Sequence, residues 1–319
     1  MEYNERVLEH FFTPRNIGKI HDADAEATVG DPACGDFIKV WIKVKDDVIE
    51  DFKYKVFGCA AAIATTSVVS VLVIGKSIKQ ALEYTDDDVV AFLGGLPSGK
   101  KHCSLLGIRG LYAVLHDVEI KKNHEKYTKR VDLYRSKGYD IPQARVELVN
   151  HIASIPKSEQ ILDVGTGKGH LAIALAKAGY SCVSIDLSSE EQHFARLNAE
   201  YFNVQDHIDL RTMNANKMDF PSHSFKGVMT ADLLHHLTDP EPALSEMLRV
   251  CQPHGFLLLA DLSERGHQIV SDVHKSEGRT HHNLGWSLQE VQKWFQKNGY
   301  KVERFDKDCE IILLVKSGQ

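Results

Sequence analysis

The feature that most constrains the fold of this 319-residue chain is a glycine-rich loop, Asp163-Val-Gly-Thr-Gly-Lys-Gly169, placed after an apolar strand predicted over 160–164. Its glycines let the backbone approach a ligand closely, and the loop opens a helix predicted over 169–178. Predicted helices and strands alternate from residue 141 onward, which is the rhythm of a doubly wound parallel sheet. Strands predicted over 301–306 and 309–315 have almost no connection between them. The sequence therefore predicts a C-terminal α/β, Rossmann-like domain that ends in an antiparallel hairpin.

A Gly-x-Gly-x-Gly loop alone would also suit a dinucleotide-binding domain. Three features favour a single adenine nucleoside instead. Asp186 follows the next predicted strand, where a carboxylate can accept both ribose hydroxyls. Phe220-Pro221 and a strand predicted over 227–230 come at the right distance for an adenine pocket, and a closing hairpin is not a trait of nicotinamide-binding domains.

Residues 140–316 resemble the class I S-adenosylmethionine-dependent methyltransferases, within the small-molecule branch that includes ubiquinone-pathway enzymes. The matching stretches are Ile161-Leu-Asp-Val-Gly-Thr-Gly-Lys-Gly169, Ile185-Asp-Leu-Ser188, Phe220-Pro-Ser-His-Ser-Phe225, Leu233-Leu-His-His-Leu237 with Asp239-Pro240, and Arg249-Val-Cys-Gln-Pro-His-Gly255. The resemblance implies that S-adenosylmethionine is held by Asp163, Gly165, Thr166, Gly167, Gly169, Asp186, Leu187, Asn214 and Ala215. In that likeness Asp186 takes the ribose. Asn214 stands at the adenine edge, where the family more often has Asp.

The methyl acceptor is predicted to be a small molecule. Nucleic-acid amino methyltransferases carry a Pro-Pro-Tyr-like tetrad where this chain reads Thr230-Ala-Asp-Leu233, and the net charge of −6 lacks the basic stripe that nucleic acids need. A catalytic base is dispensable where the reaction needs mainly alignment and desolvation. The polar stretch 264–286 is either a solvated loop or a substrate lid, in which Arg279, His281 and His282 would orient an anionic substrate or hold a metal. His235 and His236 are predicted to pack beside the cofactor.

The first 122 residues follow a different pattern. Alternating apolar and polar residues predict strands over 37–44 and 48–57, joined by a turn at Asp46-Asp47. Helices are predicted before Pro14, over 60–74, and from about 104 to 116. The sequence therefore predicts an N-terminal α+β domain with a small antiparallel sheet.

The six cysteines divide into two groups. Cys182, Cys251 and Cys309 lie in or beside apolar stretches and are interpreted as structural. In contrast, Cys34, Cys59 and Cys103 lie at the ends of predicted elements, where thiolates can bind a soft metal or an iron–sulfur cluster. Either Asp36 or His102 is the natural fourth ligand, and its weaker binding suits a site that releases what it holds.

Residues 1–122 resemble the NifU/IscU-type iron–sulfur scaffolds. The matching stretches are Thr13-Pro-Arg-Asn-Ile-Gly18, Gly30-Asp-Pro-Ala-Cys-Gly-Asp36, Phe57-Gly-Cys-Ala60 with Ala62-Ile-Ala64, and Lys100-Lys-His-Cys-Ser104. The resemblance implies a transient [2Fe–2S] cluster on Cys34, Asp36, Cys59, His102 and Cys103, with sulfur from a cysteine desulfurase and delivery to apo-proteins. Isolated members of the family also hold zinc. Scaffolds served by a dedicated Hsp70-type chaperone read Leu-Pro-Pro-Val-Lys where this chain has Leu96-Pro-Ser-Gly-Lys100, which puts that partnership in doubt.

Polar and charged residues over 123–140 predict a linker between domains 1–122 and 141–319. Its part over 127–139 is either extended linker or a helix that caps the site of the second domain. No apolar run is long enough for a membrane span, and the start lacks the order of a signal peptide, so a cytoplasmic protein is expected.

The leading hypothesis is a bifunctional protein, a cluster scaffold fused to a methyltransferase. One alternative is a regulator that holds zinc or a cluster structurally and senses S-adenosylmethionine without turnover. Another has the scaffold feed sulfur or a cluster to the substrate of the methyltransferase domain.

Overall fold

A computed structural model describes residues 3–31, 36–97, 104–280 and 285–316. The chain divides into two compact units, Met1–Lys122 and Asn123–Gln319. Each unit has hydrophobic clusters of its own, so each is described separately. Among the helices in these ranges, none combines the length and apolar character that a membrane crossing requires.

In the first unit, the described residues form an antiparallel sheet in the order β1-β2-β3, as predicted for this domain. The strands are β1 (Ala25–Asp31), β2 (Asp36–Lys45) and β3 (Val48–Phe57). Asp46 and Asp47 both have left-handed φ angles of 49° and 61°, which suit the tight turn between β2 and β3. Strand β1 was not predicted, because its inward positions carry small side chains that give a weak apolar alternation.

Helices pack on one face of this sheet. They are α1 (Glu5–Phe12), α2 (Ala60–Val73), α3 (Ile78–Ala81), α4 (Asp86–Phe92) and the first part of α5 (Ser104–Ser136). Helix α5 is much longer than the predicted helix of about 104–116, and it runs through most of the predicted linker. Neither glycine nor proline occurs between Leu111 and Lys137, and Lys121 pairs with Asp117 one turn earlier at 2.9 Å. Polar residues therefore continue this helix until Gly138.

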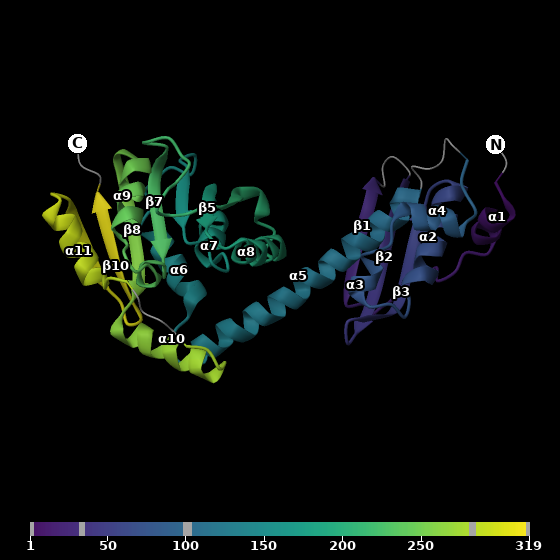
Figure 1. Ribbon diagram of the computed structural model, residues 1–319, viewed down its shortest axis with the longest axis horizontal. Coiled ribbons are helices and arrows are strands. Elements are labelled where there is room, and N and C mark those ends of the chain that lie inside the picture. Colours follow the sequence, from purple (N-terminus) through teal and green to yellow (C-terminus); the bar gives the residue numbers. More distant parts are fainter. Residues whose placement is uncertain (1–2, 32–35, 98–103, 281–284, 317–319) are drawn as a thin grey trace. The chain divides into compact units, whose positions relative to one another are not determined.

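The sheet of the second unit has the order β6-β5-β4-β7-β8-β10-β9 among the described residues (Figure 1). Its strands are β4 (Ile161–Val164), β5 (Cys182–Asp186), β6 (Ile208–Thr212), β7 (Phe225–Ala231), β8 (Cys251–Leu262), β9 (Lys301–Asp306) and β10 (Glu310–Lys316). The first five in chain order are parallel, and β10 is antiparallel to both β8 and β9, as the predicted hairpin requires. Strand β6 was not predicted, because it lies at the sheet edge with mostly exposed side chains.

Helices cover both faces of this sheet. Residues of α6 (Ile141–Asn150) and α7 (His170–Lys177) share one buried cluster with the sheet, and residues of α9 (Glu241–Val250) and α11 (Leu288–Lys297) share the other. Helix α8 (Ser189–Tyr201) lies beside β5 and β6. The domain is therefore doubly wound, as predicted.

Helix α10 (Glu264–Ser276) occupies much of the stretch interpreted as a polar loop or lid. Ser263 caps it by accepting the Gly266 N–H at 3.1 Å, and Ile269, Val270 and Val273 are buried along one side. Because this side of α10 has few apolar residues, the polar composition of the segment did not indicate a helix.

Candidate cofactor and cluster sites

The glycine loop lies at the carboxyl ends of the parallel strands. Gly165, Gly167 and Gly169 have φ angles of 90°, 50° and 83°, in the left-handed region that favours glycine. A Cβ atom on Gly165 would lie 3.0 Å from Cβ of Leu233, whereas one on Gly167 would meet no atom within 4 Å. The loop is therefore packed at its first glycine and open at its second.

Asp186, at the end of β5, is fixed by two backbone donors. Its Oδ2 atom accepts the Gly167 N–H and its Oδ1 atom accepts the Ser188 N–H, both at 2.9 Å. A carboxylate has about four acceptor positions, so this side chain keeps capacity for further donors such as ribose hydroxyls. The neighbouring Leu187 is 71% exposed, which leaves an apolar side chain beside this carboxylate.

Asp163 ends a buried chain of hydrogen bonds. The Gln192 amide donates to Thr166 Oγ1 at 3.0 Å, Thr166 and Ser184 hydroxyls lie 2.7 Å apart, and Ser184 donates to Asp163 Oδ2 at 2.6 Å. Asp163 Oδ1 is buried and has no hydrogen-bond partner among the described residues. Burial raises the pKa of Asp163 to about 7. A buried oxygen without a hydrogen-bond donor costs free energy, and a donor on a bound ligand would remove that cost.

These residues fit S-adenosylmethionine, since they offer an open glycine, a buried acceptor and a carboxylate beside one loop. The residues expected at the adenine edge fit the cofactor less well. Asn214 is exposed and its Oδ1 atom accepts the Asn216 N–H at 2.9 Å, while Ala215 is half-buried. The Met213 N–H donates to the Asp186 carbonyl at 2.8 Å, which ties this segment to the ribose side of the loop.

Tyr127 on α5 was not among the predicted site residues. Its hydroxyl lies 3.0 Å from Nδ1 of His170, the first residue of α7, and the two rings stack with their centroids 4.9 Å apart. Burial lowers the pKa of His170 to about 3 and raises the pKa of Tyr127 to about 12. A neutral imidazole therefore shares a hydrogen bond with an un-ionised hydroxyl, directly after the glycine loop. A tyrosine at helical spacing in a polar segment gives only a weak sequence signal.

A buried polar network that the sequence did not reveal lies at the other side of the loop. Arg145 on α6 is 2% exposed and donates to Asp232, which follows β7, and to Glu310, which opens β10. Tyr139 also donates to Glu310 and lies 3.2 Å from the Arg145 guanidinium. Residues from three distant parts of the sequence meet here, and only the folded sheet brings them together.

The predicted substrate-orienting residues are described in part. Arg279 follows α10 and pairs with Glu277, whereas His281 and His282 lie outside the described residues. His235 is buried and its ring pairs with Asp261, which is 3% exposed at the end of β8. Hydrogen bonding to Asp261 raises the pKa of His235 even though burial acts in the opposite direction. A substrate role for Arg279, His281 and His282 stays a prediction.

In the first unit, Cys59 is half-buried at the N-cap of α2. The sheet register pairs Phe37 with Phe57, so Asp36 in β2 and Cys59 lie at the same end of neighbouring strands. Cys34, His102 and Cys103 lie outside the described residues. Within the part of the chain that the structure describes, no group of three or more histidine, cysteine, aspartate or glutamate side chains could hold a metal ion.

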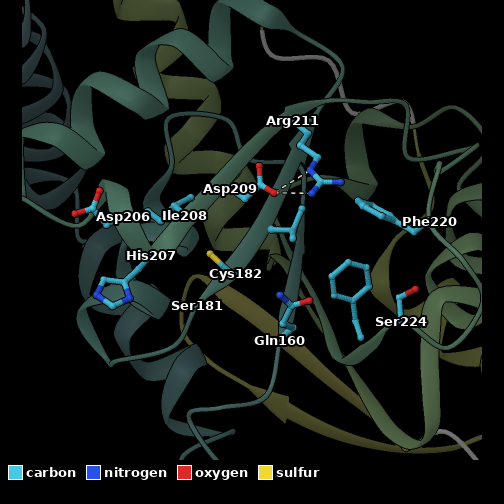
Figure 2. A pocket seen from close by; sticks show the side chains of 12 residues that line it. Gln160, Ser181, Cys182, Asp206, His207, Ile208, Asp209, Arg211, Phe220 and Ser224 are labelled. Carbon is cyan, nitrogen blue, oxygen red and sulfur yellow. Dashed lines mark hydrogen bonds and ion pairs between the residues drawn. The ribbon is translucent and has the colours of Figure 1, made fainter.

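The second unit also has a cavity of about 370 Å³, whose lining residues are shown in Figure 2. Its lining includes Gln160, Ser181, Ile208 and Phe225, which stand at the amino ends of β4, β5, β6 and β7. The glycine loop and Asp186 lie at the carboxyl ends of these strands. The cavity is therefore distinct from the candidate cofactor site.

Comparisons with known proteins assign each unit to a family. A family model described as NifU-like N terminal domain matches residues 2–125, and one described as Methyltransferase domain matches residues 162–259. The chain is 51% identical over 115 residues to the iron-sulfur cluster assembly scaffold protein IscU 1 of Archaeoglobus fulgidus, covering 36% of this chain and 75% of that protein. It is 40% identical over 126 residues to IscU of Escherichia coli K12, covering 38% and 98%.

A solved structure, a SAM dependent methyltransferase from Aquifex aeolicus, is similar over 60% of this chain and 97% of its own, with 20% identity and a TM-score of 0.47. A likeness of this size bears on neither substrate nor mechanism. The chain belongs to the NifU/IscU-type iron–sulfur scaffold family through its first unit, and its second unit is a methyltransferase domain fused to that scaffold.

Proposed function

We propose that this protein is bifunctional. Its first domain assembles a transient [2Fe–2S] cluster for delivery to apo-proteins, with sulfur from a cysteine desulfurase. Its second domain transfers a methyl group from S-adenosylmethionine to a small molecule. The observation that carries the second activity is the open position at Gly167, which lies beside the carboxylates of Asp163 and Asp186.

Different residues of the second domain bind different parts of the cofactor. Asp163 offers its unpartnered oxygen to an ammonium group, Asp186 accepts ribose hydroxyls, and Gly167 leaves room for the chain between them. When bound, the cofactor supplies an electrophilic methyl group on a sulfonium. Asp186, fixed by the N–H groups of Gly167 and Ser188, helps to align it.

The proposed cluster ligands are Cys34, Asp36, Cys59, His102 and Cys103, three of which lie outside the described residues. Support comes from Cys59, which stands at the N-cap of α2 in the part of the chain that the structure describes. Asp36 stands at the same end of the sheet. The cluster is cargo here, so the site must both assemble and release it.

Anaerobic reconstitution with iron, cysteine and a cysteine desulfurase tests the scaffold. Visible absorption of a [2Fe–2S] cluster should appear, move to an apo-ferredoxin, and be lost in Cys59→Ser. The matched control is Cys251→Ser, a buried cysteine in the other domain, which should keep the chromophore. If the first domain binds only zinc and transfers no cluster to the apo-ferredoxin, the result favours the alternative of a regulator that holds its metal structurally.

Calorimetric titration with S-adenosylhomocysteine tests the second domain, and Asp186→Ala should weaken binding. Release of S-adenosylhomocysteine from S-adenosylmethionine in the presence of candidate acceptors then separates an enzyme from a sensor. Binding without turnover would favour the sensor.

A further inference from the structure

The buried network around Arg145 carries an imbalance of charge. Its guanidinium faces the carboxylates of Asp232 and Glu310, and Tyr139 adds no charge because burial raises its pKa well above 10. Arg145 and Glu310 are 2% and 3% exposed, whereas the Asp232 side chain keeps 28% exposure. One cation thus serves two carboxylates, and the more accessible of the two is Asp232.

Glu310 already satisfies Arg145 from the other side, with Tyr139 donating to the same carboxylate. Pairing with Arg145 therefore does not by itself explain the second carboxylate. Asp232 uses one oxygen, Oδ2, for Arg145, and its Oδ1 atom has no hydrogen-bond partner among the described residues. An acceptor without a donor costs free energy, so a ligand that supplies a donor would relieve it.

The backbone places Asp232 where the reaction must occur. Val164 and Thr230 pair in neighbouring strands, so the segments that follow them, Gly165 and Asp232-Leu233, leave the sheet side by side. A Cβ on Gly165 would lie 3.0 Å from Cβ of Leu233, which confirms how closely they approach. Asp232 has a left-handed φ of 56°, and its N–H donates to the Ala260 carbonyl at 3.0 Å. Such a conformation in a non-glycine residue often marks a functional position.

We propose that Asp232 binds the methyl acceptor and takes its proton, and that the acceptor is therefore a protic nucleophile that carries an O–H, N–H or S–H group. This inference rests on the proposed methyltransferase function and adds the class of substrate to it. Arg145 is a positioning residue, because it holds one oxygen of Asp232 and leaves the other directed to the acceptor.

The transfer balances as follows. The acceptor's X–H bond breaks, and its electron pair forms the new bond to the methyl carbon. The carbon–sulfur bond breaks with its electrons left on sulfur, and the proton goes to the Asp232 carboxylate. Oδ1 is buried, so after the product leaves the proton passes from it to water that enters the vacated acceptor site.

The surroundings of Asp232 suit this proton. Burial raises its pKa to about 6, against the opposing effect of Arg145 and with support from the charges of Glu310 and Asp261. His235, which faces it from the segment after β7, acts in the same direction as Arg145. A carboxylate that titrates near neutral pH accepts protons more readily than one in its ordinary range.

Carbon-13 NMR of the full chain labelled at aspartate carboxyls, with S-adenosylhomocysteine bound, gives a readout that needs no turnover. We expect the resonance that disappears in Asp232→Asn to titrate near pH 6. Titration near pH 4 would overturn the proposal. Asparagine is chosen because it tolerates a left-handed φ as aspartate does.

Methyl transfer to dithiothreitol, catechol and ethanolamine, with isotope-labelled S-adenosylmethionine, gives the second readout. Asp232→Asn should lower kcat about 100-fold or more and remove the fall in kcat below pH 6, with S-adenosylhomocysteine affinity kept. Glu310→Gln is the matched control, since it removes the other carboxylate on Arg145 and leaves Asp232 in place. It should keep the fall in kcat at low pH, moved to lower pH because the charge of Glu310 helps to raise the pKa of Asp232.

Equal losses in both variants would mean that Asp232 only balances the charge of Arg145, and would overturn the proposal. Binding of S-adenosylhomocysteine by the wild type without methylation of any of the three probes would overturn the protic class. Failure of the wild type to bind S-adenosylhomocysteine would instead overturn the proposed function on which the inference rests.

Discussion

The hydroxyl of Tyr127 lies 3.0 Å from Nδ1 of His170, and this hydrogen bond ties α5 to the first turn of α7. The imidazole is neutral, because burial lowers the pKa of His170 to about 3. A residue before the matched methyltransferase segment thus fixes the end of the glycine loop.

Tyr127→Phe should lower the free energy of unfolding of the second domain by about 1 kcal/mol, because the part-buried Nδ1 atom of His170 loses its hydrogen-bond partner. It should also weaken S-adenosylhomocysteine binding about fivefold, since the loop is held less firmly. Urea unfolding and calorimetry measure the two effects. Tyr201→Phe is the control, because Tyr201 stacks on His124 through its ring alone among the contacts described. Equal effects from both substitutions would contradict this role.

Acidification should destabilise the second domain through His170. The folded pKa of about 3 lies below the unfolded value of about 6.5, so as pH falls the unfolded chain takes up the proton first. Stability from this group is complete above pH 6.5 and is lost progressively toward pH 3, by about 2 kcal/mol between pH 7 and pH 5.

The measurement is the difference in unfolding free energy between wild type and His170→Asn at each pH, because asparagine keeps an acceptor for Tyr127. A difference is needed since Asp163 and Asp232 have raised pKa values and shift stability in the opposite sense over part of this range. A difference that does not change with pH would show that the pKa of His170 is the same in the folded and unfolded states, which would contradict this prediction.

Gly167→Ala should separate folding from cofactor binding. Its φ of 50° is left-handed, so alanine should cost about 1 kcal/mol of stability, but the new Cβ meets no protein atom. The open space is the proposed place of the cofactor, so S-adenosylhomocysteine affinity should fall at least tenfold. Gly179→Ala has the same open surroundings at a φ of 88° and lies after α7. It should show a similar cost in thermal melting with full affinity.

Gly110→Ala should destabilise the scaffold domain by about 1–3 kcal/mol, because the added Cβ would lie 3.0 Å from Val40 and 3.3 Å from Ile38. Helix α5 would then have to move away from β2. Arg109→Ala, an exposed change on the same turn, should leave unfolding nearly unaltered. Thermal melting followed by cluster assembly would show whether a shifted α5 also impairs the cluster site.

The sequence predicted elements whose apolar pattern is strong. Strand β2 alternates between apolar and polar residues over part of its length, β3 does so from Phe52 onward, and β4 has buried apolar residues on both sides of Asp163. The glycine loop and Asp186 indicated the end of the sheet where we propose that the cofactor binds. Edge strand β6 and amphipathic α10 were missed, because exposed positions carry little pattern.

Residues that meet only in the folded domain could not be predicted from local patterns in the sequence. Arg145, Asp232 and Glu310 are separated by long stretches of chain and have no shared motif. Only the order of β7, β8 and β10 in the sheet, together with α6, brings their charges together.

Helix α5 also bears on how such a fusion is inherited. The matched methyltransferase segment begins at residue 162, yet Tyr127, Tyr139 and Arg145 all precede it and belong to the second compact unit. A gene fragment cut at the family boundary would encode a sheet without its arginine and a glycine loop without its tyrosine. Recombination that joined a scaffold gene to a methyltransferase gene would have to include the codons of these residues. The boundary between the two functional units therefore lies inside helix α5 and not at its end.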